Sequence, residues 1–117
     1  MMRFALLLFD PEGYAESVTE AGMTAALAEH EAFARHLRER GVPFTGEALH
    51  PAARTLRPGP PGEPPVAADG PFVPLRHELA GFYLVECADL DEAEELARHC
   101  PIGAGIEIRP IWDAPGP

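Results

Sequence analysis

Residues 4–9 read FALLLF, and this short stretch decides the fold. In an extended strand, Phe4, Leu6 and Leu8 would point to one face, and the alternate residues would point to the other. A strand that is apolar on both faces is typical of the centre of a covered sheet. The run of six apolar residues is too short for a signal-peptide core or a membrane span. We therefore expect a central strand in a cytoplasmic protein.

The residues after this strand predict a long helix. From about residue 19 to residue 40, apolar residues recur at three- and four-residue steps, and most charged residues lie elsewhere on the helical wheel. Thr24 could cap the main body of this helix, and Gly41 is a stop signal. The expected core-facing stripe consists of Met23, Leu27, His30, Phe33, Ala34 and Leu37.

The second half of the chain predicts further strands and a second helix. The tract PGPPGEPP at 58–65 is expected to form the exposed tip of a hairpin, because proline removes backbone donors. Asp89, with Glu92 three positions later, predicts a helix start, and Pro101 ends that helix. Strands are expected at 44–48, 54–57 and 66–68, at 79–87, which reads LAGFYLVEC, and at 106–111.

This order of elements predicts one α+β domain over residues 1–117. With right-handed connections, it gives a ferredoxin-like split βαβ arrangement, an antiparallel sheet with two helices on one face. The opposite face would then be bare, although the central strands are apolar on both sides. We expect that face to be buried against a second copy in a two-fold homodimer.

The composition limits the partners and cofactors. The 117 residues include 19 acidic and 9 basic ones, a formal net charge of −10, which opposes binding to nucleic acid and to anionic membranes. Cys87 and Cys100 lack CxxC spacing and are expected to be reduced and structural. His99 and Cys100 are adjacent and no second pair has ligand spacing, so neither a metal nor another cofactor is expected.

Two side chains stand out as candidates for chemistry. His30 lies on an apolar helix stripe, where it is either a core residue or a partly buried general base. Asp69 lies in the stretch ADGPF at 68–72, where Asp-Gly-Pro favours a tight turn. Its carboxylate either bonds its own backbone or serves a site. Tyr83, His50 and Arg76 are the candidate substrate-binding residues. Alternatively, Tyr83 only packs in its strand, His50 is a surface or loop residue, and Arg76 is solvated.

Several segments in order resemble one family, the DGPF-domain branch of the YCII-related proteins. They are FALLLF, EHEAFARHLRERG, GEAL, ADGPF and ELAGFYLVECADLDEAEELARHCP followed by IEIRP, and they cover nearly the whole chain. The resemblance implies a dimeric ferredoxin-like barrel, found mostly in bacteria, with a His-Asp pair proposed as active site in the wider superfamily. His30 matches the helix histidine, and Asp69 matches the Asp of the DGPF motif. The chain departs from the pattern at PGPPGEPP and at RHELAG.

Three functions are compatible with these observations. The first is a small cofactor-independent enzyme of lyase, isomerase or hydrolase type, acting on a small polar or aromatic molecule with His30 and Asp69. The second is a non-catalytic ligand-binding or regulatory dimer, which the resemblance links to alternative sigma factors. In the third, His30 and Asp69 only hold the fold. Fold alone does not decide between them.

Overall fold

The computed structural model describes residues 1–74 and 76–112, so residues 113–117 of the expected domain lie outside the described residues. The elements of the described chain are, in order, β1 (Met2–Pro11), α1 (Tyr14–Ser17), α2 (Glu20–Glu39), β2 (Phe44–Ala48), β3 (Arg54–Arg57), β4 (Val66–Asp69), β5 (His77–Cys87), α3 (Leu90–Ala97) and β6 (Gly105–Pro110). No helix in these two ranges is long and apolar enough to cross a membrane.

The main sheet has the strand order β2-β5-β1-β6, and all its pairs are antiparallel. This is the predicted ferredoxin-like α+β arrangement, and β1, which contains FALLLF, is a central strand. Strand β1 extends beyond FALLLF, because Asp10 and Pro11 pair with Glu78 and His77. The register between β1 and β5 shifts between Leu8 and Phe9, at the same end of the sheet.

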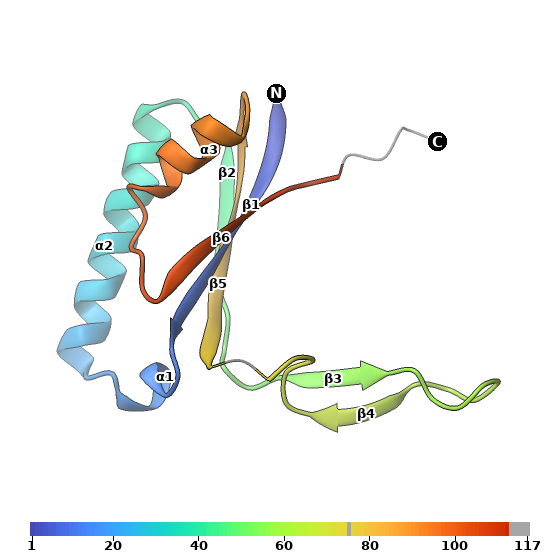
Figure 1. The fold of residues 1–117 in the computed structure, drawn as a ribbon. Coiled ribbons are helices and arrows are strands. Elements are labelled where there is room, and N and C mark those ends of the chain that lie inside the picture. The colour runs from blue at the N-terminus through green and yellow to red at the C-terminus, as the bar shows by residue number, and fades with distance from the viewer. Residues whose placement is uncertain (75, 113–117) are drawn as a thin grey trace.

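Helices α2 and α3 cover one face of this sheet (Figure 1). Phe4, Leu6 and Leu8 of β1 are buried beneath them, as the alternation predicted. The remaining core residues are Phe33, Leu37, Val42, Val85, Cys87, Ala93, Leu96, Ala97 and Cys100. Both cysteines are free and buried, in agreement with their expected structural role.

The expected cap and stripe of α2 need correction. Thr19, not Thr24, is the N-cap, and its hydroxyl accepts a hydrogen bond from the Gly22 amide at 3.0 Å. A cap needs extended backbone, which Thr19 has, whereas Thr24 lies inside the helix. Only the C-terminal half of the stripe packs on the sheet, since Met23 and Leu27 are 46% and 61% exposed. The N-terminal half of α2 therefore lies beyond the core.

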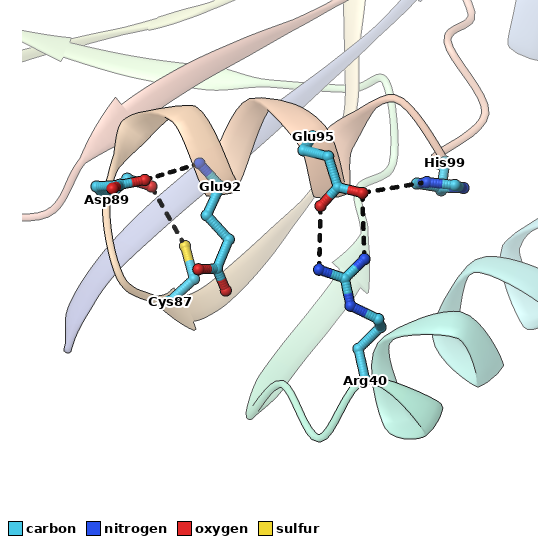
Figure 2. A network of polar contacts seen from close by, with 6 residues as sticks. All are labelled: Arg40, Cys87, Asp89, Glu92, Glu95 and His99. Atoms are coloured by element: carbon cyan, nitrogen blue, oxygen red, sulfur yellow. Dashed lines mark hydrogen bonds and ion pairs between the residues drawn. The ribbon is translucent and has the colours of Figure 1, made fainter.

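The ends of α2 and α3 are fastened by polar contacts (Figure 2). The Arg40 guanidinium donates to both carboxylate oxygens of Glu95, at 3.2 and 3.1 Å. The Asp89 side chain accepts from the Glu92 amide at 2.9 Å, which confirms the predicted cap of α3. His36 of α2 and His99, just after α3, stack with ring centroids 3.9 Å apart.

Strands β3 and β4 form a separate two-stranded sheet. This hairpin leaves one end of the main sheet and points away from the side that carries the helices (Figure 1). The tract at 58–65 connects the two strands, as predicted, and is almost entirely exposed. The predicted turn at ADGPF needs correction, because Ala68 and Asp69 are the last two residues of β4 and Asp69 pairs with Arg54. The chain leaves the strand at Gly70, whose φ of 112° is a conformation that glycine adopts readily.

Candidate functional site

An open cleft of about 1280 Å³ lies at the end of the sheet from which α1 and the hairpin depart. Its walls come from β1, α1, residues 23–34 of α2, β2 and β5, and from the segments 49–52 and 101–103. Most of the wall is apolar, which explains the exposed Met23 and Leu27: they face this cleft rather than the sheet. The polar side chains in the lining are Asp10, Tyr14, Glu16, Glu29, His30, Glu47, His50, Glu78 and Tyr83.

His30 and Tyr83 form the central polar contact of the cleft. His30 Nδ1 and the Tyr83 hydroxyl are 2.8 Å apart, a hydrogen bond between α2 and β5. The Tyr83 ring is fixed by an edge contact with Phe33, at a centroid distance of 5.0 Å. Burial raises the pKa of Tyr83 to about 12, so the phenol keeps its proton at neutral pH.

Gly46 makes room for the Tyr83 ring. The two residues are opposite each other in the β2–β5 register. A Cβ atom at position 46 would stand 2.5 and 2.6 Å from two ring carbons of Tyr83. The ring therefore lies across the backbone of β2, in space that only a glycine leaves free. This glycine is part of the geometry that brings the phenol to His30.

Asp10 is one of two carboxylates whose charges act on His30. Burial lowers the pKa of His30, and the charges of Asp10 and Glu29 act in the opposite direction. The pKa of Asp10 is raised by burial and by the charge of Glu78, its partner across the β1–β5 pair, while His30 lowers it. At neutral pH the imidazole is therefore held neutral, and a carboxylate is close enough to respond to its charge.

Glu78 holds the end wall of the cleft in place. Its carboxylate accepts hydrogen bonds from the Gly13 amide at 2.9 Å and from the Ala15 amide at 3.4 Å. These contacts tie the start of α1 to β5. The short helix is thereby kept against the sheet end, next to Asp10.

The structure brings together only some of the expected site residues. Tyr83 and His50 line the cleft with His30, and His50 Nδ1 accepts from the Ala52 amide at 3.0 Å. Arg76 is exposed and lies outside the lining. Asp69 also lies outside it: its carboxylate accepts from Arg54 Nε at 3.2 Å on the exposed hairpin. Within one chain, His30 and Asp69 therefore do not share the cleft, and their joint role stays a prediction.

Sequence reasoning missed Asp10, Glu78 and Gly46. Asp10 ends the apolar run of β1, a position from which a strand can place a carboxylate at a sheet edge, so a signal was present. Gly46 in a strand is a known mark of close backbone approach. Glu78 carried no local signal, because its role depends on the β1–β5 register.

The geometry suits proton transfer better than nucleophilic attack. Burial raises the pKa of Cys100 to about 12 and also raises that of Cys87, so neither thiol is a ready nucleophile. Among the described residues no group of three His, Cys, Asp or Glu side chains is placed to hold a metal ion. A neutral imidazole bonded to a neutral phenol in an apolar cleft can accept one proton and donate another.

The fold and the cleft together define a ferredoxin-like α+β protein with a His-Tyr pair at one end of its sheet. The chain matches the family described as "YCII-related domain" over residues 2–115, and it belongs to that family. It is also 33% identical over 116 residues to "Uncharacterized protein R00369" of Rhizobium meliloti (strain 1021), a match that covers 94% of this chain and 92% of the relative.

Proposed function

We propose that this chain is a cofactor-independent enzyme that transfers protons on a small aromatic or otherwise largely apolar molecule. The observation that carries the proposal is the 2.8 Å contact between His30 Nδ1 and the Tyr83 hydroxyl in an open, mostly apolar cleft. In this proposal Nδ1–H donates to the phenol oxygen. His30 Nε2 is then the general base, and the Tyr83 O–H donates to the substrate.

Asp10 supports this assignment of roles. When the imidazole takes a proton from the substrate, the charge of Asp10 stabilises the imidazolium that forms. A neutral resting imidazole, an adjacent carboxylate and a phenol donor suit an isomerase or lyase that removes a proton next to a carbonyl group. Asp69 would reach a His30 only across a dimer, from the hairpin of a second copy.

The test follows deuterium incorporation from D2O into 1-phenylpropan-2-one by proton NMR. The intact chain is expected to exchange the acidic C–H faster than buffer at the same pH. His30→Gln is expected to lose about 100-fold or more of that excess, the usual contribution of a general base. His77→Gln is the matched control, since His77 is exposed and outside the cleft lining.

Equal exchange in the intact chain and His30→Gln would refute the catalytic role of His30. Saturable binding of the ketone without any exchange would instead favour a non-catalytic, ligand-sensing module. The two outcomes are read from one sample, because line broadening of the ketone reports its binding.

We also infer that the functional unit is a two-fold homodimer of the DGPF branch. The helices leave one sheet face bare (Figure 1), and Ala5, Leu7, Phe82 and Leu84 lie on that face, half-buried only by their neighbours. The radius of gyration of 16.8 Å exceeds the roughly 13 Å typical of a compact domain of this length. The motif at 69–72 supports the branch. Sedimentation that shows a folded monomer at micromolar concentration would contradict the dimer.

A further inference from the structure

The ionised side chains that line the His30 cleft are all of one sign. Five carboxylates contribute to the wall, from Asp10, Glu16, Glu29, Glu47 and Glu78. Asp10 and Glu78 are half-buried near the His30 end of the cleft, while the other three are exposed. The charges of Asp10 and Glu29 both act on His30, and both carboxylates line the same cleft as the His30–Tyr83 contact.

No cation in the described lining balances these charges. The chain contains nine arginines and no lysine, all nine arginines lie among the described residues, and none lines the cleft. Arg38 stacks over the Phe44 ring at 5.6 Å from its centroid, but is itself outside the lining. Arg40, Arg54, Arg98 and Arg109 are each paired with a carboxylate elsewhere. Arg76, the arginine expected to bind substrate, is also absent from the wall.

The rest of the wall sets the shape of a suitable ligand. Met23 and Leu27 contribute to the wall from α2, and Leu8, Phe44 and Leu79 contribute from three strands of the main sheet. Such a surface buries an apolar body and leaves specificity to a few polar groups. These carboxylates would repel a negatively charged group of a ligand. They would attract an ammonium group.

We propose that the cleft is selective for aromatic or aliphatic amines, with the apolar body against α2 and β5 and the ammonium group among Asp10, Glu29 and Glu78. This inference rests on the proposed function only in using the same cleft, and it names the substrate class. The resting imidazole fits such a ligand, because burial lowers the pKa of His30 and keeps a competing positive charge away.

Electrostatics sets the size of the selectivity. A unit charge about 6 Å from one carboxylate changes affinity about tenfold at an effective dielectric constant near 40. This interaction increases the affinity for a ligand with an ammonium group and decreases the affinity for a ligand with a carboxylate. We therefore expect at least about a tenfold preference for an amine over a neutral analogue, and a larger one over an acid.

The experiment measures binding of three probes of similar size by isothermal titration calorimetry at pH 7 and low salt. The probes are 2-phenylethylamine, 2-phenylethanol and 3-phenylpropanoate. The expected order of affinity is amine, then alcohol, then acid, and the preference for the amine should shrink as salt is added. Equal affinities, an acid that binds best, or no binding of the amine at 10 mM would each overturn the proposal.

Paired variants locate the selectivity in the cleft. Asp10→Asn is expected to weaken the amine about tenfold, since a charge-assisted contact is lost. Glu29→Gln should weaken it about two- to fivefold, because that carboxylate is exposed. Glu31→Gln is the matched control: it lies two residues along α2, is exposed, and is outside the lining. An equal loss in the Glu29 and Glu31 variants would also overturn the proposal.

The two proposals fail in different ways. If deuterium exchange depends on His30 but the cleft shows no preference for the amine, the proposed ligand class is refuted and the proposed enzyme activity is supported. If the amine preference depends on Asp10 but exchange is unchanged in His30→Gln, the proposed enzyme activity is refuted and the proposed ligand class is supported.

Discussion

Replacing Tyr83 by Phe removes one hydroxyl from the centre of the cleft and leaves the ring in place. The ring contacts with Phe33, at 5.0 Å, and with Phe44, at 6.4 Å, do not involve the hydroxyl, so packing should survive. The hydrogen bond to His30 Nδ1 at 2.8 Å is lost. A bond of this kind contributes about 1 kcal/mol net to the free energy of unfolding.

That free energy sets the expected change in melting temperature. For 117 residues, the entropy of unfolding is about 250 cal/mol/K, so a loss of about 1 kcal/mol lowers the Tm by about 4 °C. Exchange of 1-phenylpropan-2-one should fall as well, because Tyr83 Oη no longer orients the imidazole or donates to the substrate. Differential scanning calorimetry and the NMR exchange assay measure the two effects on the same sample.

Tyr14→Phe is the matched control for this substitution. Tyr14 also lines the cleft, and in the described part of the chain its hydroxyl makes no hydrogen bond that the structure records. The Tm of the Tyr14→Phe variant should change by less than about 2 °C, as for substitutions that break no specific contact. If both variants lowered the Tm equally, or if Tyr83→Phe left both Tm and exchange unchanged, the His30–Tyr83 contact would not be the organising feature of the cleft.

Three further predictions test the geometry. Leu37→Ala should lower the free energy of unfolding, measured in urea, by about 2.7–5 kcal/mol, because Leu37 is fully buried. Leu27→Ala should change it little, because Leu27 is 61% exposed. Similar losses in the two variants would contradict the finding that only the C-terminal half of the α2 stripe packs on the sheet. Gly46→Ala should displace the Tyr83 ring and reduce exchange as strongly as Tyr83→Phe, and an unchanged His30 imidazole NMR signal would refute this. The pKa of Asp10 is raised above its ordinary 3.8, so the folded state holds the proton more tightly and loses stability as pH rises through the folded pKa. Asp10→Asn should therefore raise the Tm at pH 7, with a gain that disappears below pH 3.8, and a lower Tm at pH 7 would contradict the cause given.

Much of the fold could be read from local patterns. FALLLF is apolar on both faces and became a central strand, and the strands at 44–48 and 54–57 were placed correctly. Asp89 caps α3 as its spacing with Glu92 predicted. The helix stripe was only half correct, because periodicity shows which side of a helix is apolar but not whether a sheet or a cleft faces it. Met23 and Leu27 share the stripe with Leu37 and meet a different environment.

In the candidate site, too, some features follow from the sequence and others only from the tertiary structure. The sequence by itself determined that His30 would stand on the inner side of a helix and that Tyr83 would lie in a central strand. The predicted turn begins one residue late, because Asp69 is the last residue of β4 and pairs with Arg54. Only the tertiary structure decided which side chains meet. His30 and Tyr83 are 53 positions apart, and Asp10 faces Glu78 through a strand register with a shift between Leu8 and Phe9. Register is set by how the whole sheet packs under its helices, so no local pattern could assign Asp10 rather than Asp69 to His30 within one chain.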